Sequence, residues 1–570
     1  MQQFSRNRNL CRRAFVNGAA AFSLTFLAAG IPALAQGFGG LDIPFFPGNL
    51  VLSRSVYDNN ASNIAVGTAL PPNCAKTVGP CAPATNNGIY PFVFNNVIPD
   101  PAFGITSKIF LDQITPFGLV LNSIEVPNSS QWNGRSGNNQ LVTSFSSKSE
   151  MALNLSTDGK LLTFMGYVAP VNTIDASNSN TPGAIDPTDP VGINFFRAVA
   201  TVDSNGKFTF TETNAYSGNN GRAAILNNTN GANFFYTVGN AGNGSNPQPN
   251  GVILGAGAQF IDPSTAPESF QTPANPTPLG SFSVTLLGDK ADKVGKDDNF
   301  RGLTVFNNVV YFTKGSGSNG VDTVYFVDTT GSACPKGVGV PAVAATLPIA
   351  PLNLSGVNPQ NGLPNNICIL SGFPTTLAKN LATPAAPFGL WFANADTLYV
   401  ADEGDDFTSD TTLYTHAAAQ TTAGIQKWVF NSSSKTWSLA YTLQTGLELG
   451  VPYTVDHYPT GNNSATNLPW APATDGIRNI TGTVDFGGKV TIYGITSTVS
   501  GGGDQGADPN RLVAVTDTLS NTDPTTAAKE KFSIVRKAGF AEVLRGVAFA
   551  PTGKEDDDHG HNDHGFGFGW

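Results

Sequence analysis

A repeated pair of strands is the feature that most constrains how this chain can fold. The stretches "RAAILNNTNGANFFYTVGNAG", "RGLTVFNNVVYFTKGSGSNG", "FGLWFANADTLYVADEGDD" and "RNITGTVDFGGKVTIYGITSTVSGGGDQG" share one pattern. Each has an apolar strand, a tight polar turn, a second strand with an aromatic residue, and a long loop rich in Gly, Asn and Asp. Such self-similarity indicates a repeat architecture.

The repeats keep a regular spacing along the chain. Their first residues are Arg222, Arg301, Phe388, Arg478 and Arg545, which lie 79, 87, 90 and 67 residues apart. "MALNLSTDGKLLTF" from Met151 is an earlier copy. This spacing fits four-stranded sheets joined by long loops, which are the blades of a β-propeller.

The two ends of the chain together complete one more blade. The last copy, "LRGVAFAPTG" from Leu544, has no further strands after it, whereas "NLVLSRSVY", "KIFLDQI" and "LVLNSIEVP" are strands that lack a first strand. Joining them closes the ring and protects the open edges. The sequence therefore predicts an all-β fold, a β-propeller of about six four-stranded blades or alternatively seven, over residues 45–552. In architecture the chain resembles secreted bacterial β-propellers, a resemblance that assigns no named family.

Residues 1–35 have the pattern of an export signal. A basic region and an apolar stretch precede the small-residue cleavage pattern Ala33-Leu34-Ala35. Arg12-Arg13, followed by Ala-Phe-Val, resembles the twin-arginine motif of proteins that fold before export, and ordinary secretion with a chance arginine pair is the alternative. We expect a periplasmic or extracellular protein.

The charge and hydropathy of the chain exclude two classes of partner. Removal of the signal, which carries four arginines and no acidic residue, takes the formal charge from −10 to −14. A strongly acidic chain is not expected to bind nucleic acid. After the signal no run approaches the roughly 18 apolar residues that span a bilayer. We therefore expect no transmembrane segment in the mature chain, and its oligomeric state stays open.

Four cysteines remain once Cys11 leaves with the signal, and an even number suits an oxidising compartment. Cys74 and Cys81 are close enough for a local disulfide, and Cys334 with Cys368 would close a longer loop. Three pairings are open on the sequence alone. A metal site is disfavoured because no Cys-x-x-Cys pair and no nearby histidine accompany them.

The arginines that start the repeats are candidate ligand-binding residues. In an antiparallel blade the first strand starts on the face where the second strand ends, so these arginines and the long loops should share one rim of the channel. An acidic or amide residue, Asn219, Asp298, Asp475 or Glu542, lies three positions before each arginine. These residues either pair with an arginine and tie blades together, or leave guanidinium groups to bind phosphate, sulfate or carboxylate. The candidate ligand-binding residues are Arg222, Arg301, Arg478, Arg545, Asp298, Asp475 and Glu542.

Two further segments could bind metal ions. The loop "ADEGDDFTSD" offers Asp402, Glu403, Asp405 and Asp406 as oxygen ligands for Ca²⁺, although it does not match an EF-hand and a solvated acidic turn is the alternative. Asp504 and Asp508 should lie in the equivalent loop of the next blade. Residues 553–570 form an Asp-, His- and Gly-rich tail, expected to be disordered, whose histidines could bind transition metals. These histidines are His559, His561 and His564.

No common catalytic signature occurs, so the catalytic residues are unknown and enzymatic activity stays open. Neither a nucleophile elbow, a zinc-binding His-Glu-x-x-His helix nor a P-loop is present. The leading hypothesis is a secreted propeller that binds an anionic or hydroxyl-rich ligand, such as a phosphorylated compound or a polysaccharide, at the channel rim. A calcium-dependent phosphoester or ester hydrolase, by analogy with phytase-like and lactonase-like propellers, is one alternative. A structural envelope or matrix protein is the other.

Overall fold

The computed structural model describes most of the chain between residues 45 and 553. The described ranges are 45–60, 62–63, 65, 69–70, 82–83, 104–131, 140–145, 147–174, 176–185, 193–240, 257–263, 268–269, 299–315, 320–334, 336–349, 366–463, 467–501 and 505–553. The chain divides into the units Met1–Asp42 and Ile43–Trp570, and every described residue belongs to the second. The predicted export signal and the His-rich tail lie outside the described residues.

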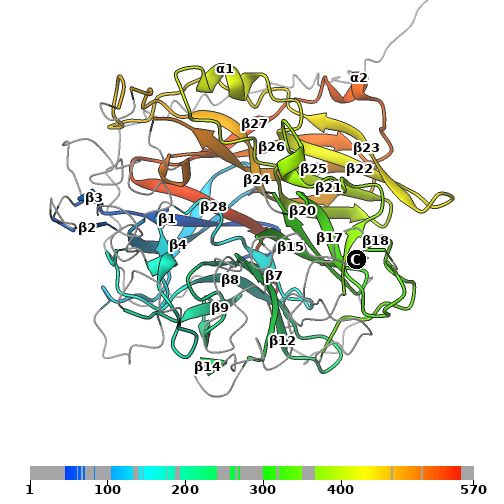
Figure 1. Ribbon diagram of the computed structural model, residues 1–570, viewed down its shortest axis with the longest axis horizontal. Coiled ribbons are helices and arrows are strands. Elements are labelled where there is room, and N and C mark those ends of the chain that lie inside the picture. Colours follow the sequence, from blue (N-terminus) through cyan, green and yellow to red (C-terminus); the bar gives the residue numbers. More distant parts are fainter. Residues whose placement is uncertain are drawn as a thin grey trace, which may run out of the picture. The chain divides into compact units, whose positions relative to one another are not determined.

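Six small sheets form a ring, and the fold is a six-bladed β-propeller (Figure 1). The all-β fold class is confirmed, with six blades rather than seven. Blade 1 combines the C-terminal strand with three N-terminal strands, and blades 2 to 6 follow in chain order.

The strands of blades 1 to 3 are short. Each is antiparallel to its neighbours, except that β14 is parallel to β10. They are β1 (Leu50–Val56), β4 (Thr106–Ile114), β5 (Val120–Glu125) and β28 (Glu542–Phe549) in blade 1; β7 (Asn154–Leu155), β8 (Leu161–Tyr167), β9 (Arg197–Asp203), β10 (Phe208–Thr213) and the parallel β14 (Glu268–Ser269) in blade 2; and β11 (Gly221–Asn227), β12 (Phe234–Gly239) and β13 (Ala258–Ile261) in blade 3.

Blades 4 to 6 repeat this arrangement with four antiparallel strands each. They are β15 (Phe300–Phe306), β16 (Val309–Lys314), β17 (Thr323–Val327), β19 (Ile367–Leu370) and the parallel β18 (Val338–Gly339) in blade 4; β20 (Pro387–Asn394), β21 (Thr397–Asp402), β22 (Gly424–Asn431) and β23 (Thr436–Leu443) in blade 5; and β24 (Ala473–Val484), β25 (Lys489–Val499), β26 (Arg511–Thr518) and β27 (Ser533–Lys537) in blade 6.

Short elements lie outside the blade pattern. They are the pair β2 (Ala69–Leu70) and β3 (Ala82–Pro83), the strand β6 (Thr143–Ser144), which pairs with β4, the helices α1 (Leu413–Ala418) and α2 (Pro524–Ala527), and 3₁₀ turns at Ala176–Asn178, Ala378–Asn380 and Gln505–Ala507.

The ring is closed by pairing the two ends of the folded chain, as the sequence predicts. β28 is the innermost strand of blade 1 and pairs along its whole length with β1, from Leu50 opposite Phe549 to Val56 opposite Glu542. The Ser53 hydroxyl accepts a hydrogen bond of 2.8 Å from the backbone N–H of Gly546. In Figure 1 the red β28 lies beside the blue β1. β28 therefore covers the inner edge of β1.

Glycines that follow the repeat anchors let the inner strands approach one another closely. A Cβ atom on Gly302 would collide with the backbone oxygen of Phe388, the anchor of the next blade, and one on Gly389 would lie 2.7 Å from the backbone oxygen of Arg478. Separations below about 3 Å are not tolerated by real Cβ atoms. The Arg-Gly and Phe-Gly pairs are therefore required by packing around the channel.

A buried polar cluster joins blades 5 and 6 away from the channel. We call it the seam cluster; it consists of Tyr399, Lys427, Tyr441, Asp517 and Glu530. The Lys427 ammonium lies 3.1 Å from Asp517 Oδ2 and donates to the Tyr441 hydroxyl at 3.0 Å, and both tyrosines donate to Asp517. Lys427 also donates to two backbone oxygens, at 2.8 Å each. Every donor position of this ammonium is thus used.

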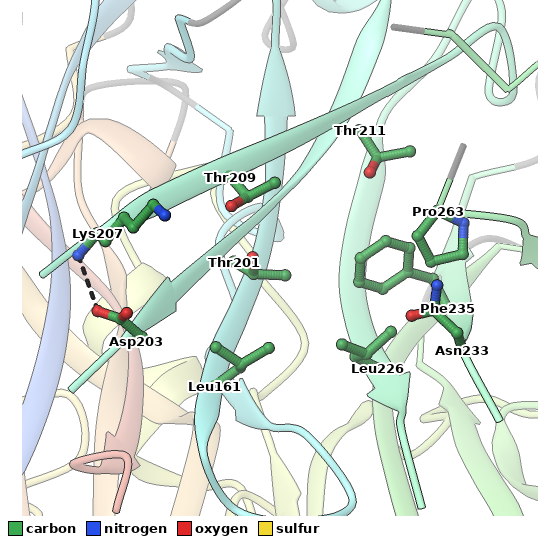
Figure 2. Close-up of a pocket in the computed structure, with 10 residues that line it drawn as sticks. All are labelled: Leu161, Thr201, Asp203, Lys207, Thr209, Thr211, Leu226, Asn233, Phe235 and Pro263. Atoms are coloured by element: carbon green, nitrogen blue, oxygen red, sulfur yellow. Dashed lines mark hydrogen bonds between the residues drawn. The ribbon is translucent and has the colours of Figure 1, made fainter. Parts of the chain in front are cut away.

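Blades 2 and 3 leave a cavity of about 290 Å³ between them (Figure 2). One wall comes from β9 and β10, and the other from β11 and β12. Nearer the inner strands the same interface is closed by an apolar cluster that includes Met165, Val199 and Leu226. The cavity lies at one end of these strands, where β8 starts at Leu161 and β9 ends at Asp203.

Candidate functional site

The repeat anchors all lie on the innermost strands. Arg545 is on β28, Arg222 on β11, Arg301 on β15, Phe388 on β20 and Arg478 on β24. All four arginine side chains are buried. Because these strands surround the propeller axis, the anchors bring positive charge to the channel even though the chain as a whole is acidic.

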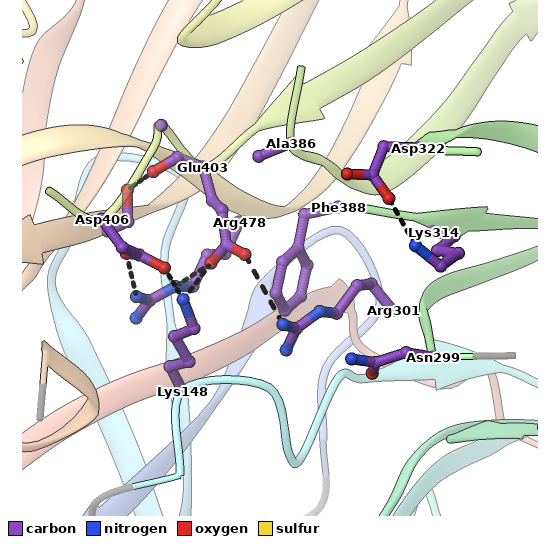
Figure 3. A network of polar contacts seen from close by, with 12 residues as sticks. Lys148, Asn299, Arg301, Lys314, Asp322, Ala386, Phe388, Glu403, Asp406 and Arg478 are labelled. Carbon is purple, nitrogen blue, oxygen red and sulfur yellow. Dashed lines mark hydrogen bonds and ion pairs between the residues drawn. The ribbon is translucent and has the colours of Figure 1, made fainter. Parts of the chain in front are cut away.

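Glu403 is the centre of the charged group in the channel. Its carboxylate lies 3.0 Å from Arg478 Nε, 3.7 Å from Lys148 Nζ and 4.0 Å from Arg301 Nη2 (Figure 3). Burial by itself would raise the pKa of Glu403, but the three cations lower it to about 2. With Asp406 these residues form what we call the channel cluster: Lys148, Arg301, Glu403, Asp406 and Arg478.

Lys148 and Asp406 form the accessible edge of the channel cluster. Their side chains contact each other in an ion pair and are 21 % and 22 % exposed, in contrast to 3 % for Arg478. Asp406 Oδ1 lies 4.0 Å from Arg478 Nη2, and neither of these two buried atoms makes a hydrogen bond in the described part of the chain. Asp406 has a φ of 52°, which holds its backbone in the left-handed region. We call this partly exposed edge, formed by Lys148 and Asp406, the channel mouth.

Arg222 continues the row of positive charge without a carboxylate partner. It donates to the Oδ1 atoms of Asn299 and Asn220 and, at 2.8 Å, to the backbone oxygen of Phe300, and it forms no ion pair with any described carboxylate. Burial, and then repulsion from Arg301, lowers its pKa well below the ordinary value. The pKa of Arg301 is lowered by burial and by repulsion from Arg478. The three guanidinium groups therefore repel one another.

Arg545 ties blade 1 to the chain that enters blade 2. It donates to the backbone oxygens of Phe145 and Ser147 and, at 3.3 Å, to the hydroxyl of Ser55. These contacts match the interpretation that some anchors hold blades together.

Three of the four acidic and amide residues that lie three positions before the anchors are described, and these three do not pair with those anchors. Glu542 contacts Arg54 at 2.5 Å, and Asn219 accepts from Asn240. Asp475 accepts from Gln420 at 2.5 Å and from the backbone N–H of Asp406 at 3.1 Å. β-bulges at Arg222 and Arg545 and on both sides of Ile477 interrupt the strand register there, so spacing along the chain does not decide which side chains meet. Asp298 lies outside the described residues.

Asp475 is nonetheless part of the wall of the channel mouth. It is fully buried, and burial, followed by the charge of nearby Asp405, raises its pKa well above the ordinary value. Gln420 bridges the two carboxylates, donating to Asp405 at 3.0 Å as well. His416, stacked on Phe407, lies 3.2 Å from Asp405. The raised pKa favours the neutral carboxyl of Asp475 and so reduces the negative charge beside Arg478.

The four carboxylates predicted to bind calcium all contact protein groups. Asp402 accepts from the backbone N–H groups of Ala386 and Gly404, each at 3.0 Å, and burial raises its pKa to about 6. Glu403 and Asp406 contact cations, and Asp405 contacts Gln420 and His416. Calcium at these residues stays a prediction. In the next blade Asp504 lies outside the described residues, and Asp508 is buried and accepts from Tyr458.

One of the predicted disulfides is present. Cys334 and Cys368 are bonded, with their Cα atoms 5.9 Å apart, and the bond is consistent with an exported protein. Cys74 and Cys81 lie outside the described residues, so their pairing stays a prediction. No helix in the described chain is long and apolar enough to cross a membrane.

Lys148 and Glu403 were not linked by the sequence interpretation, because Lys148 lies in a segment, "SSKSE", that belongs to no repeat. Glu403 was read only as a metal ligand. Arg197 was also missed: it is fully buried and donates to the backbone oxygens of Phe195, Ser177 and Asn219. The contacts of these residues become visible only in the folded structure, because the residue types alone do not indicate their partners.

Comparisons with known proteins show no close relative. The chain matches no protein-family model, and no curated protein sequence is detectably similar to it. An acylaminoacyl peptidase of Pyrococcus horikoshii has 6 % identity and a TM-score of 0.26, covering 74 % of this chain and 43 % of the peptidase. This chain thus spans less than half of the peptidase's length.

A second solved structure is a polysaccharide lyase of family PL25, an ulvan lyase bound to -[GlcA(1-4)Rha3S]-. It has 10 % identity and a TM-score of 0.30, covering 84 % of this chain and 96 % of the lyase. Similarities this weak carry no argument about function.

Proposed function

We propose that the channel mouth binds the anionic group of an extracellular ligand. The group is a carboxylate, sulfate or phosphate, carried by a polysaccharide or a phosphorylated compound. The observation that supports this most directly is the buried Nη2 atom of Arg478, which has no hydrogen-bond acceptor among the described residues. Arg478 shares the carboxylates Glu403 and Asp406 with the partly exposed Lys148. A buried guanidinium donor without an acceptor is costly, and an anion would satisfy it.

The charges around this atom favour an anion over a cation. Arg222 forms no ion pair with a described carboxylate, Arg301 repels both Arg222 and Arg478, and the raised pKa of Asp475 favours its neutral form. Burial strengthens the attraction of such a group for a negative charge. Arginine also matches the planar geometry of carboxylate, sulfate and phosphate.

Asp406 occupies the position that the ligand's anionic group would take. Its carboxylate contacts Lys148 and faces Arg478 Nη2 from 4.0 Å, too far for a hydrogen bond. We infer that the ligand displaces Asp406, binds Lys148 and moves closer to Arg478. Glu403 stays in place because it holds Arg478 and Arg301 in position.

A structural role is the second candidate function, favoured by the contacts of Arg545 to backbone oxygens. In that case the anchors only join blades and the protein belongs to an envelope or matrix. Calcium-dependent hydrolysis by a phytase-like or lactonase-like mechanism has no comparable observation in its favour and stays a prediction.

The test is isothermal titration of the full-length protein with polygalacturonate, dextran sulfate and inositol hexakisphosphate, and with neutral dextran as the control ligand. We expect at least one anion, and not dextran, to bind more weakly as salt is raised. Lys148→Ala removes a charged contact of about 1.5–3 kcal/mol, or about 10- to 100-fold in Kd. Asp406→Ala removes the competing carboxylate, and its Kd should fall.

Lys489→Ala is the matched control, because Lys489 is an exposed lysine on β25, outside the channel cluster. Its Kd should equal that of the unaltered protein. Binding of no anion, or equal loss in Lys148→Ala and Lys489→Ala, would leave the structural role as the better account. Repeating the titration with Ca²⁺ and with a chelator tests the calcium prediction.

A further inference from the structure

We propose that the cavity between blades 2 and 3 is a second binding site, for a neutral, hydroxyl-rich ligand the size of one or two sugar rings. Its volume of about 290 Å³ lies at the lower end of the range for small-molecule sites. The proposal does not depend on the channel site, because no residue of the channel cluster lines this cavity.

Three threonine hydroxyls form the polar wall of the cavity. Thr201 on β9 is the cross-strand partner of Thr209 on β10, and Thr211 follows two residues later, so all three lie on one face of blade 2. None of these hydroxyls hydrogen-bonds to another residue within the described ranges. Thr201 and Thr211 are only 7 % and 6 % exposed. Their hydroxyl oxygens are open to the cavity rather than enclosed in the protein, so they are free to pair with a polar group bound there.

The opposite wall is apolar. It consists of Leu226 on β11, Phe235 on β12 and Pro263 after β13. Figure 2 shows the Phe235 ring directed across the cavity toward β10. Leu226 and Phe235 are buried at the back of the cavity, whereas Thr209 and Asn233 are exposed at its opening.

These two walls match the two kinds of surface on a sugar. Its hydroxyl groups both donate and accept, as the threonine hydroxyls do, and its C–H face can pack on an aromatic ring. A wholly apolar ligand would leave three hydroxyls unpaired. A strongly charged ligand is not favoured, because Asp203 and Lys207 bring opposite charges to the same turn, and Asp203 Oδ1 accepts from the backbone N–H of Lys207 at 2.9 Å.

Ordered water is the competing occupant, since a polar cavity of this size also holds water. The difference between the occupants is testable. A sugar must use both walls together, whereas water needs only the hydroxyls. Removing the hydroxyls without changing the shape of the cavity therefore separates a sugar site from a wet gap.

The experiment is saturation-transfer NMR and titration of the full-length protein with maltose, cellobiose and lactose. We expect at least one disaccharide to bind, and the double substitution Thr201→Val with Thr211→Val to raise its Kd at least tenfold. Valine keeps the shape of threonine, and the melting temperature reports whether the variant folds. The control is Thr516→Val, a half-buried threonine on β26 outside the cavity, which should bind normally.

A crystal soaked with the best disaccharide should show a sugar ring between the Phe235 ring and β10. Three results would overturn the proposal. These are no saturation transfer to any of the three sugars, an unchanged Kd in the double variant, and a soaked crystal with only water in the cavity. Because the anion titration uses other ligands and other variants, either proposal can fail without the other.

Discussion

The channel cluster and the seam cluster are both buried groups of opposite charges, but they differ in how completely their cations are bonded. In the seam, Lys427 contacts a carboxylate, a hydroxyl and two backbone oxygens. In the channel, Arg478 uses Nε on Glu403 while its Nη2 has no hydrogen bond in the described chain.

The difference separates a structural contact from a candidate site. A fully bonded buried ion cluster is a fixed part of the core, and removal of one member is strongly destabilising. A partly bonded cluster with an exposed edge can accept a ligand at lower cost, because one of its atoms already lacks a partner. Exposure follows the same division, since the Lys427 side chain is 0 % exposed and that of Lys148 is 21 % exposed.

The largest expected effect is on stability, from the same substitution made in each cluster. Lys427→Met should lower the free energy of unfolding by about 3–5 kcal/mol, because it leaves the Asp517 carboxylate buried without its cation. Lys148→Met should cost less than about 1 kcal/mol, because its ion pair is partly exposed. Urea denaturation of both variants measures the contrast. Equal losses would show that the channel cluster is as structural as the seam.

The next prediction separates the clusters by pH. The pKa of Glu403 is lowered to about 2 from 4.5, so its contribution to stability is present above pH 4.5 and lost as the pH falls toward 2. The effect is of the order of 3 kcal/mol. In the seam, burial and the charge of Asp517 raise the pKa of Glu530 to about 7. There the folded state keeps a proton that the unfolded state releases, so stability falls as the pH rises from 4.5 to 7.

Urea denaturation across this pH range checks both signs. Glu403→Gln should flatten the acidic part of the profile relative to the unaltered protein, and Glu530→Gln should flatten the part between pH 4.5 and 7. If Glu530→Gln left the profile between pH 4.5 and 7 unchanged, Glu530 would not be the group of the seam cluster that holds the proton.

The smallest expected effect is that of Asp406→Asn on stability. The free energy of unfolding should change by no more than about 0.5 kcal/mol, because the pair with Lys148 is partly exposed and asparagine tolerates the left-handed backbone. Thermal melting with urea titration measures it. A loss above about 1 kcal/mol would mean that Asp406 holds the channel together, and the inferred displacement by a ligand would then be untenable.

Most of the fold could be predicted from the sequence, because the same pair of strands recurs in successive blades. The strand pairs after Arg222, Arg301 and Arg478 are predicted correctly, as is the pairing of the first and last strands. The close packing of Gly302 and Gly389 explains why the anchors are followed by glycine. The Cys334–Cys368 bond was one of several possibilities that only the arrangement of strands could decide.

The partners of the charged residues could not be predicted, because they come from different blades. Glu403 is 75 residues from Arg478 in sequence, and Lys148 belongs to a connection with no repeat. The proposed pairing at three residues' separation could not foresee the β-bulge at Arg545, and Glu542 contacts Arg54 on the neighbouring strand instead.

Because β28 closes the ring, the inner edge of β1 stays uncovered during synthesis until β28 has been made. Gly546 hydrogen-bonds to Ser53 across 493 residues of sequence. At translation rates of about 5–20 residues per second, β1 is made roughly 25–100 s before the strand that covers its inner edge. For that interval the edge of β1 can pair with a strand of another molecule, and contacts so distant in sequence form slowly afterwards. The cell must therefore keep the growing chain apart from its copies until residues 542–549 have been made.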